Sequence, residues 1–417
     1  MNSVSGLPGS ASQYAPDGRY ACARLALAVG ITTLIGVGMW AIIVVLPEAQ
    51  ADFGADRAAA SLPYTVMMCA FAFSTIALGR MTDRRGIVPP LIISAVTLGS
   101  GFVLAGYAQS LVVFTAAHVL IGVGSGAGFA PMMADISHWF VKRRGLAVVI
   151  VAAGSYFAGT IWPLLMNLAI PLIGWRGTYA GIGVIVAAAV LPLAFAMRRR
   201  PDAAVYERAE AATEAARADL SISPRLLMTL LVLAGFSCCV AMSMPQVHLV
   251  AYCGDLGYGV ARGAQMLSLM MGLGIISRIG SGFVADSIGG ATTLLIGSVM
   301  QGVALLLYLY FNGLESLFVV SAIFGLFQGG IVPMYAVICR ELLPPRRAGA
   351  AIGLVVSATI LGMAFGGYIS GVIFDLTSSY RMAFFNGVLW NALNLVIVSW
   401  LVWRHQRRQP AGALMPA

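Results

Sequence analysis

Charged side chains are scarce in this sequence. Only 10% of its 417 residues are Asp, Glu, Lys or Arg, whereas 59% are apolar, and the mean hydropathy is +0.89. Soluble domains carry roughly 25% charged residues. So little charge excludes a soluble globular protein, and with it a soluble enzyme or binding module.

Motifs that bind metals, phosphates or disulfide partners are lacking as well. The six cysteines show no C-x-x-C spacing, and most lie in or beside apolar runs, so neither a disulfide framework nor a zinc site is indicated. The sequence contains no Gly-rich phosphate-binding loop and no metal-ligand cluster. We therefore expect no cofactor, no metal, no ATP-driven step and no enzymatic activity.

What the sequence has instead is a series of apolar runs of about 20 residues, each long enough to cross a hydrocarbon core of about 30 Å. In lipid the backbone must be paired within the chain, so each run predicts a helix. The expected fold is an all-α membrane protein. Its twelve expected spans are 24–47, 61–79, 88–107, 111–134, 145–169, 177–197, 225–251, 263–286, 291–311, 315–339, 348–373 and 382–403.

The basic residues predict the orientation of the chain. Of the 25 Lys and Arg residues, Arg57, Arg176, Arg262 and Arg381 fall in one set of connections, Arg278 lies within a span, and all others fall on the side of the termini. Cytoplasmic loops carry such an excess. We therefore expect both termini in the cytoplasm and the protein in a cell membrane, such as a bacterial inner membrane. The same distribution explains the net charge of +9 without nucleic-acid binding.

The two halves of the chain repeat. Segment 79–86 corresponds to 282–289 at an offset of 203 residues, and the same offset takes 143–144 to 346–347. A constant offset predicts two pseudo-symmetric six-helix halves, related by an axis along the membrane normal. The expected parts are a cytoplasmic tail without a cleavable signal at 1–23, a first half at 24–197, a cytoplasmic linker at 198–224, a second half at 225–403, and a cytoplasmic tail at 404–417.

Arg278 is the one charge placed deep within a span. It lies about eight residues inside, or roughly 12 Å from water at 1.5 Å per residue. A guanidinium stays protonated, and a charge at bilayer depth costs at least ~2.5–3.5 kcal/mol. Two hypotheses follow. Either Arg278 binds an anion, or it is held by backbone carbonyls or a hidden carboxylate and locks helices together.

The chain resembles the major facilitator superfamily over nearly its whole length. Segment 79–86, Gly-x-x-x-Asp-Arg-x-Gly, is similar to the family's cytoplasmic loop motif. Segment 139–147, Trp-Phe-Val-Lys-Arg-Arg-Gly-Leu-Ala, most resembles the monocarboxylate-porter and oxalate/formate-antiporter branch. The resemblance implies a twelve-helix transporter fold and places Arg278 where the branch carries its substrate-pairing arginine.

The chain departs from that branch near the expected site. The animal porters pair the arginine with an aspartate one helical turn earlier, where this chain has Gly274, and carry a lysine where it has Trp40. Oxalate exchangers carry a second cation in the span that corresponds to 348–373, which contains none here. A single cation suits a monoanion better than a dianion, because an uncompensated carboxylate is costly to desolvate. The missing aspartate also removes the obvious proton carrier.

The loops at 79–86 and 282–289 predict a gate. Glycine permits a tight turn with left-handed backbone, and a carboxylate is favoured at the positive start of a neighbouring helix. A contact that forms only when one side is closed would gate that side; the alternative is that these charges only set topology. The expected gating residues are Gly79, Asp83, Arg84, Gly86, Asp286, Arg143 and Arg144.

Polar and aromatic side chains within spans are candidates for lining a central cavity. The competing interpretation is that amphipathic rings anchor the protein at the membrane interface. Together with Arg278, the expected substrate-binding residues are Trp40, Tyr64, Tyr156, Gln328 and Tyr335. Histidine titrates near neutral pH, so His118 and His248 are candidates for carrying protons. Asp135 is another candidate, or a partner for a nearby basic group; we name His118 and Asp135 as the proton-coupling residues.

These features predict a secondary active transporter for a small organic monoanion of the monocarboxylate kind, working by alternating access through proton symport or anion exchange. The alternative is an exporter of bulky amphipathic or drug-like compounds in which Arg278 is structural. A receptor that signals without transport is disfavoured, because the longest soluble stretch is the linker 198–224. The expected partners are a small organic anion, protons and the lipid bilayer, with the protein monomeric.

Overall fold

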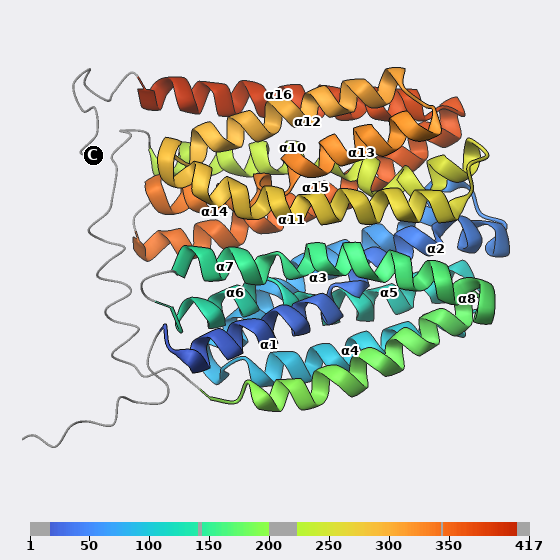
Figure 1. Cartoon of the computed structure of the whole chain (residues 1–417), viewed down its shortest axis with the longest axis horizontal. Helices are drawn as coiled ribbons and strands as arrows, with labels where there is room; N and C mark the ends of the chain where they lie inside the picture. The colour runs from blue at the N-terminus through green and yellow to red at the C-terminus, as the bar shows by residue number, and fades with distance from the viewer. Residues whose placement is uncertain (1–16, 141–143, 200–222, 343–344, 407–417) are drawn as a thin grey trace, which may run out of the picture.

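The computed structural model describes residues 17–140, 144–199, 223–342 and 345–406, which are almost entirely helical, with no strand among them. The helices run side by side along one axis (Figure 1). In a hydrocarbon layer this arrangement pairs the backbone groups within each segment. The all-α membrane architecture is therefore confirmed. Most of the expected linker and most of both expected tails lie outside the described residues.

The first half of the chain forms a bundle whose helices are joined by short connections. Its helices are α1 Arg19–Ile35, α2 Val37–Phe53, α3 Arg57–Arg85, α4 Val88–Gly106, α5 Leu111–Ser125, the 3-10 helix η1 Gly126–Gly128, α6 Ala130–Ser137, α7 Arg144–Ala152 and α8 Gly154–Ala196. Local capping sets one of these boundaries clearly: the Asp56 carboxylate accepts a hydrogen bond from the N–H of Ala59 at 2.7 Å and so starts α3.

The second half repeats this layout. Its helices are α10 Pro224–Asp255, α11 Val260–Ile288, α12 Gly290–Tyr310, α13 Leu314–Gln328, α14 Ile331–Leu342, α15 Pro345–Thr377 and α16 Tyr380–Gln406. Helices α3 and α11 end alike, at Gly86 and Gly289, each with a φ of 81°. Only glycine adopts this backbone without strain, so the two loops that match in sequence also turn in the same way.

The number of membrane crossings agrees with the prediction of twelve. Eleven stretches of the described chain are long and apolar enough to cross a membrane. One of them, Leu146–Ala196, has 51 residues and turns back at Gly174, where φ is 70° (Figure 1). Since about 20 residues suffice for one crossing, this stretch accounts for two.

The two halves meet along a seam that runs through the middle of the bundle. Helices α1 to α8 lie mainly in the lower part of Figure 1 and α10 to α16 in the upper part. Across the seam, α3 packs against α15, α7 and α8 pack against α11, and α2 packs against α10. We call the end of the bundle where α1 begins and α16 ends the terminal face, and the opposite end the far face.

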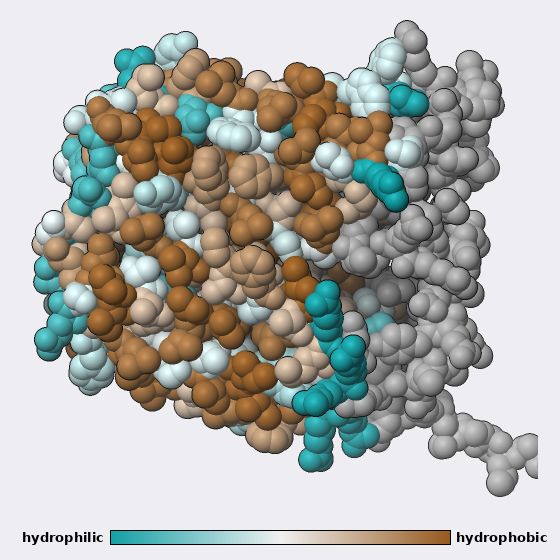
Figure 2. All heavy atoms as spheres, turned by 180° about the vertical axis from the view of Figure 1, so that it is seen from behind, coloured by the Kyte–Doolittle hydropathy of each residue, from teal (hydrophilic) through white to brown (hydrophobic). Residues whose placement is uncertain are grey.

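The outer surface is that of a protein embedded in lipid. Figure 2 shows hydrophobic residues spread over the middle of one side, with hydrophilic residues gathered toward the two ends. Large apolar side chains such as Phe73, Leu168 and Val396 are each 68% exposed. Burial in hydrocarbon removes such side chains from water, so this surface is stable in a bilayer and not in solution.

Candidate functional site

Arg278 lies at the seam, in α11, about 15 Å from the end of that helix at 1.5 Å per residue, and is 3% exposed. Its Nε donates to the carbonyl oxygen of Gly329 at 3.0 Å, and its Nη1 donates to that of Ala152 at 2.6 Å. Since Gly329 belongs to the second half and Ala152 to the first, the guanidinium bridges the halves. The ion pairs found among the described residues do not include Arg278.

Both acceptor carbonyls are available because a helix is interrupted beside each of them. In a regular helix the N–H of Tyr156 would bind the Ala152 carbonyl, but here it donates to Ala153 at 2.9 Å. Gly329 stands four residues before Pro333, which has no N–H to donate. The carbonyl ends of α7 and α13 therefore direct partial negative charge at the guanidinium.

Tyr156 covers one face of this guanidinium. The Cζ of Arg278 lies 4.2 Å from the centroid of the Tyr156 ring. Gly274, one helical turn before Arg278, leaves room for the ring, because a Cβ at that position would collide with Tyr156 Cε1. An aromatic face attracts a cation but carries no net charge. The position that could have held a pairing carboxylate is thus filled by a ring, and no carboxylate in the described part of the chain compensates the charge of Arg278.

A cavity of about 210 Å³ lies between the halves and reaches Arg278. Its walls include Leu146, near the start of α7, and Ala285, near the end of α11, so it extends from Arg278 toward the terminal face. Among the described residues, Arg278 is the only charged one that lines it. The other lining residues are Phe129, Met133, Leu146, Val148, Val149, Ala152, Ile279, Gly282, Phe283, Ala285, Val332, Pro333, Met334, Ala336, Val337, Ile352 and Val356.

The far face is closed by contacts between the halves around Arg57, the first residue of α3. The Arg57 Nη2 donates to Asp255, at the end of α10, at 2.8 Å. The N–H groups of Arg57 and Ala58 donate to the two carboxylate oxygens of Asp375, in α15, at 2.9 and 2.6 Å. We call Arg57, Asp255 and Asp375 the far-face clasp.

Burial and ring contacts strengthen this clasp. Arg57 is 5% exposed, and its Cζ lies 5.1 Å from the ring of Phe374 and 5.9 Å from that of Tyr380. The Asp375 carboxylate also places a negative charge at the amino end of α3, where the helix dipole favours it. The molecule is therefore closed at the far face and hollow on the terminal side of Arg278.

Trp40 and Tyr64, two of the expected binding residues, lie at the seam but do not line the described cavity. The Trp40 Nε1 donates to the carbonyl of Ser155 at 2.8 Å, and its ring packs on Gly159. Tyr64 packs against Gly367 of α15, and its hydroxyl has no hydrogen-bond partner among the described residues. Tyr64 thus joins the two halves, whereas these contacts of Trp40 stay within the first half. Contact of either residue with a ligand remains a prediction.

Gln328 and Tyr335 are buried within the second half, and neither lines the described cavity. The Gln328 Oε1 accepts a hydrogen bond from Gln246, while its Nε2 has no partner among the described residues. The Tyr335 hydroxyl donates to Asn394 at 2.8 Å, and Asn394 in turn donates to Ser298 at 2.8 Å. Of the five expected companions of Arg278, the structure brings only Tyr156 into contact with it.

The expected gating residues lie at the terminal face, and the structure describes them only in part. Gly86 adopts the expected left-handed turn, and a Cβ at Gly79 would meet nothing within 4 Å. Arg84 is exposed. Arg143 and the side chains of Asp83, Asp286 and Arg144 lie outside the described part of the chain. The proposed gate at this face therefore stays a prediction.

His118 and His248 are both buried away from the described cavity. The Nδ1 of His118 bonds to the carbonyl of Phe114 at 2.8 Å, and its Nε2 has no partner among the described residues. The Nε2 of His248 bonds to the carbonyl of Gly367 at 2.8 Å, and its Nδ1 has none there. Each ring thus keeps one free nitrogen, but the structure connects neither of them to Arg278.

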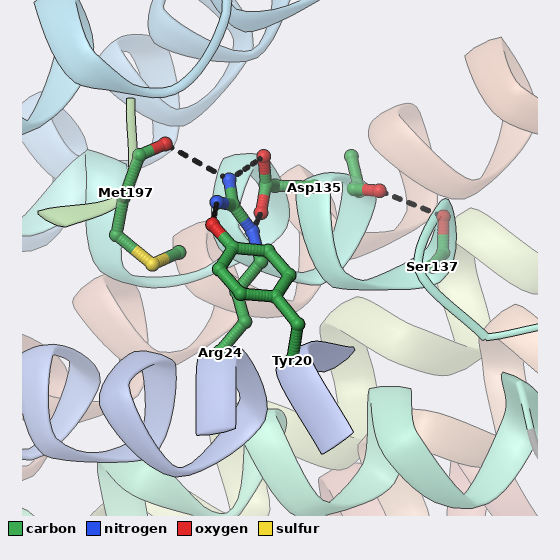
Figure 3. Close-up of polar contacts among 6 residues, drawn as sticks. Tyr20, Arg24, Asp135, Ser137 and Met197 are labelled. Atoms are coloured by element: carbon green, nitrogen blue, oxygen red, sulfur yellow. Dashed lines mark hydrogen bonds and ion pairs between the residues drawn. The ribbon is translucent and has the colours of Figure 1, made fainter. Parts of the chain in front are cut away.

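Asp135 pairs with Arg24, which agrees with the hypothesis that Asp135 is a partner for a nearby basic group. Figure 3 shows the Arg24 side chain reaching from α1 to Asp135 of α6. The two bonds measure 2.9 and 2.8 Å, and Arg24 also donates to the carbonyl of Met197 at 3.1 Å. Arg24 and Asp135 are 2% and 7% exposed. The bidentate pair ties three helices of the first half together near the terminal face.

We expect the replacement Asp135→Ala to destabilise the protein by ~3–5 kcal/mol, because it leaves the buried Arg24 without its counter-charge. The control is Asp52→Ala, which breaks the ion pair between Asp52 and Arg176. Their side chains are 43% and 37% exposed, respectively. An exposed pair contributes ~0–1 kcal/mol. Unfolding of the purified protein in detergent measures both variants, and equal losses would show that the Arg24–Asp135 pair is not a special constraint.

Sequence reasoning allowed for backbone carbonyls around Arg278 but did not identify those of Ala152 and Gly329, and it missed the far-face clasp. The sequence holds one local signal for the Gly329 carbonyl: Pro333 follows by four residues and has no N–H to bind it. The clasp has no local signal, because Arg57 and Asp375 are 318 residues apart. In sequence, Arg57 is simply one of the few basic residues in the far-face connections.

Comparisons with known proteins agree with this architecture. A sequence model of the Major Facilitator Superfamily matches residues 28–316 and 280–415. The chain is 26% identical to rat "Monocarboxylate transporter 13" over 311 residues, which are 73% of this chain and 71% of that protein. It is 25% identical to "Agnestins efflux protein AgnL12" of Paecilomyces divaricatus over 334 residues, 78% of this chain and 73% of that one. It is 26% identical to "Uncharacterized MFS-type transporter YcxA" of Bacillus subtilis over 366 residues, 84% and 88% of the two chains.

Proposed function

This chain belongs to the Major Facilitator Superfamily and is a membrane transporter, not an enzyme, and from this premise we propose that it carries a small organic monoanion by alternating access. The proposed substrate pairs its carboxylate with Arg278. One observation carries the proposal: Arg278 lines the cavity at the seam with its charge uncompensated by any carboxylate among the described residues. A relative named as a monocarboxylate transporter supports the same ligand class.

The charge at the site favours a monoanion. One guanidinium can grip one carboxylate through two parallel hydrogen bonds. A second carboxylate would meet only apolar walls among the described lining residues. Burying an unpaired charge in such surroundings is strongly unfavourable, so a dianion should bind much more weakly.

The Ala152 carbonyl links substrate binding to movement of the halves. In the structure Arg278 holds the first half through this carbonyl and the second half through Gly329. A carboxylate is a stronger acceptor than a carbonyl for a charged donor. An arriving substrate would therefore displace the Ala152 carbonyl, and the hydrogen bond that ties Arg278 to the first half through that carbonyl would be lost. The halves could then rock about the bound anion.

We propose that the state described opens toward the terminal face, because the cavity extends from Arg278 in that direction. We propose that this face is cytoplasmic, because the basic residues gather there, and that the protein lies in the cell membrane as a monomer with its halves at 24–197 and 225–403. Transport is coupled either to protons or to exchange of a second anion. His118 keeps a ring nitrogen without a partner in the described part of the chain, which could take up a proton, whereas Asp135 is engaged by Arg24.

Uptake into proteoliposomes tests this function. The panel consists of labelled monocarboxylates from acetate to phenylacetate, assayed at pH 8, where a carboxyl group with a pKa of about 4.3 is ionised and leaks slowly. We expect at least one acid to enter faster than into empty liposomes. Stimulation by an inward proton gradient would indicate symport, and stimulation by the same acid preloaded inside would indicate exchange. Uptake of none of the acids under either condition would refute the proposal.

A second candidate is export of bulky amphipathic compounds. The apolar cavity wall favours it, and one relative is named as an efflux protein. Such an exporter would accept neutral or cationic compounds and would not need Arg278. Raised drug tolerance on expression, unchanged in an Arg278→Ala variant, would support export over anion transport.

A further inference from the structure

The described wall of the cavity lacks polar side chains other than that of Arg278. Apart from Arg278, no described lining residue has a side chain that donates or accepts a hydrogen bond. The other described lining residues are apolar, with Val149, Phe283 and Val332 as examples. A hydroxyl, keto or second carboxylate group on a bound acid would therefore lose its water without gaining a side-chain partner.

The size of the cavity sets an approximate upper limit on the ligand. A cavity of about 150 Å³ holds benzene, so about 210 Å³ holds roughly eight or nine heavy atoms in proportion. An acid as small as acetate would leave most of the apolar wall without contacts. A medium-length alkyl chain attached to one carboxylate would fill the space.

We propose that the substrate is a monocarboxylate with an apolar body of about five or six heavy atoms beside the three of its carboxylate, such as a medium-chain acid. This inference rests on the proposed function, because it assumes that the carboxylate sits on Arg278. The carboxylate lies at the deep end of the cavity, and the apolar body points toward the terminal face between α7, α14 and α15. Hydroxy acids, keto acids and dicarboxylates of the same length are poor ligands.

Binding to the full-length protein in lipid nanodiscs tests this, with empty nanodiscs as the blank. Across butyrate, hexanoate and octanoate, we expect affinity to rise about three- to fourfold per methylene and to level off once the cavity is full. Phenylacetate should bind at least about tenfold more tightly than mandelate, which adds one hydroxyl. Octanoate should exceed both its dicarboxylate counterpart suberate and the neutral octanamide.

A matched pair of variants tests whether the apolar body of the ligand lies beside α15. Ile352 lines the cavity on α15, whereas Leu354 on the same helix is 54% exposed and does not line it. Ile352→Trp should weaken octanoate binding by about tenfold or more and change butyrate binding less than threefold. Leu354→Trp should change neither.

The possible outcomes separate this inference from the function beneath it. Arg278-dependent binding in which acetate, lactate or oxalate equals octanoate would overturn the apolar-body proposal and leave anion transport intact. Equal effects of the two Trp variants would overturn it as well. Octanamide binding as tightly as octanoate, or octanoate binding unchanged in Arg278→Ala, would overturn both, because the carboxylate would then not be on Arg278.

Discussion

Replacing Arg278 by Ala should reduce anion transport to the level of empty liposomes. The replacement removes the positive charge that we propose grips the carboxylate. Each hydrogen bond to a charged group contributes ~1.5–3 kcal/mol, so losing two should weaken binding by at least about a hundredfold. The measurement is initial uptake of whichever acid the proteoliposome panel identifies, normalised to the amount of folded protein.

Two further variants make this result specific. Arg278→Lys keeps the charge but loses the planar fork, so we expect binding intermediate between the parent and the Ala variant. Arg262 lies on the same helix, where its exposed side chain donates a hydrogen bond to Gln265. The Arg262→Ala variant should transport normally. If Arg278→Ala transports at the parental rate, the substrate site lies elsewhere in the cavity.

Much of the fold follows from the sequence because the bilayer imposes it. Length and hydropathy predict twelve crossings, and the pairing of glycine-ended loops at 79–86 and 282–289 predicts the repeat. Both rest on local rules: a span needs about 20 apolar residues, and a left-handed turn needs glycine. Where a rule is local, as at Gly86 and Gly289, the structure agrees with the prediction.

The sequence predicts the surroundings of Arg278 less completely. Its depth showed that it needs either an anion or carbonyl partners, and the structure supplies carbonyls at Gly329 and Ala152. These acceptors are 51 and 126 residues away in sequence. Which carbonyl meets the guanidinium depends on how the halves pack, and no local pattern encodes that packing.

The same reason explains why five aromatic and amide residues were grouped together but only Tyr156 contacts Arg278. A residue in the middle of a span can face the seam, the interior of its own half or the lipid. The side on which a residue lies follows the helical period of 3.6 residues. In a span that is apolar all round, no polar face shows which side points to the seam. Tyr335 shows the consequence, since its hydroxyl turns into the second half to meet Asn394.

The final prediction concerns the far-face clasp. Arg57→Ala should open the far face, because it removes the ion pair to Asp255 and the stacking on Phe374 and Tyr380, all of which join the two halves. A partly exposed ion pair and two cation–π contacts together contribute ~1.5–3 kcal/mol. The population open at the far face should therefore rise roughly ten- to hundredfold.

Labelling of a cysteine beneath the clasp measures this change. Ser61, one helical turn from Arg57, is fully buried and donates to the Arg57 carbonyl at 2.7 Å. In a Ser61→Cys background, an impermeant maleimide added from the far side should react faster when Arg57 is Ala. The parent chain with its six native cysteines gives the background rate.

Arg176 provides a control with nearly the same chemistry. It also sits over two aromatic rings, Phe53 and Trp175, and pairs with one aspartate, Asp52, but all of these belong to the first half. Arg176→Ala therefore loses similar contacts without loosening the seam, and labelling at position 61 should stay at the parental rate. If both variants raise labelling equally, general destabilisation is the cause; if neither does, the closed far face is held by the packing of α3 on α15 and not by charge.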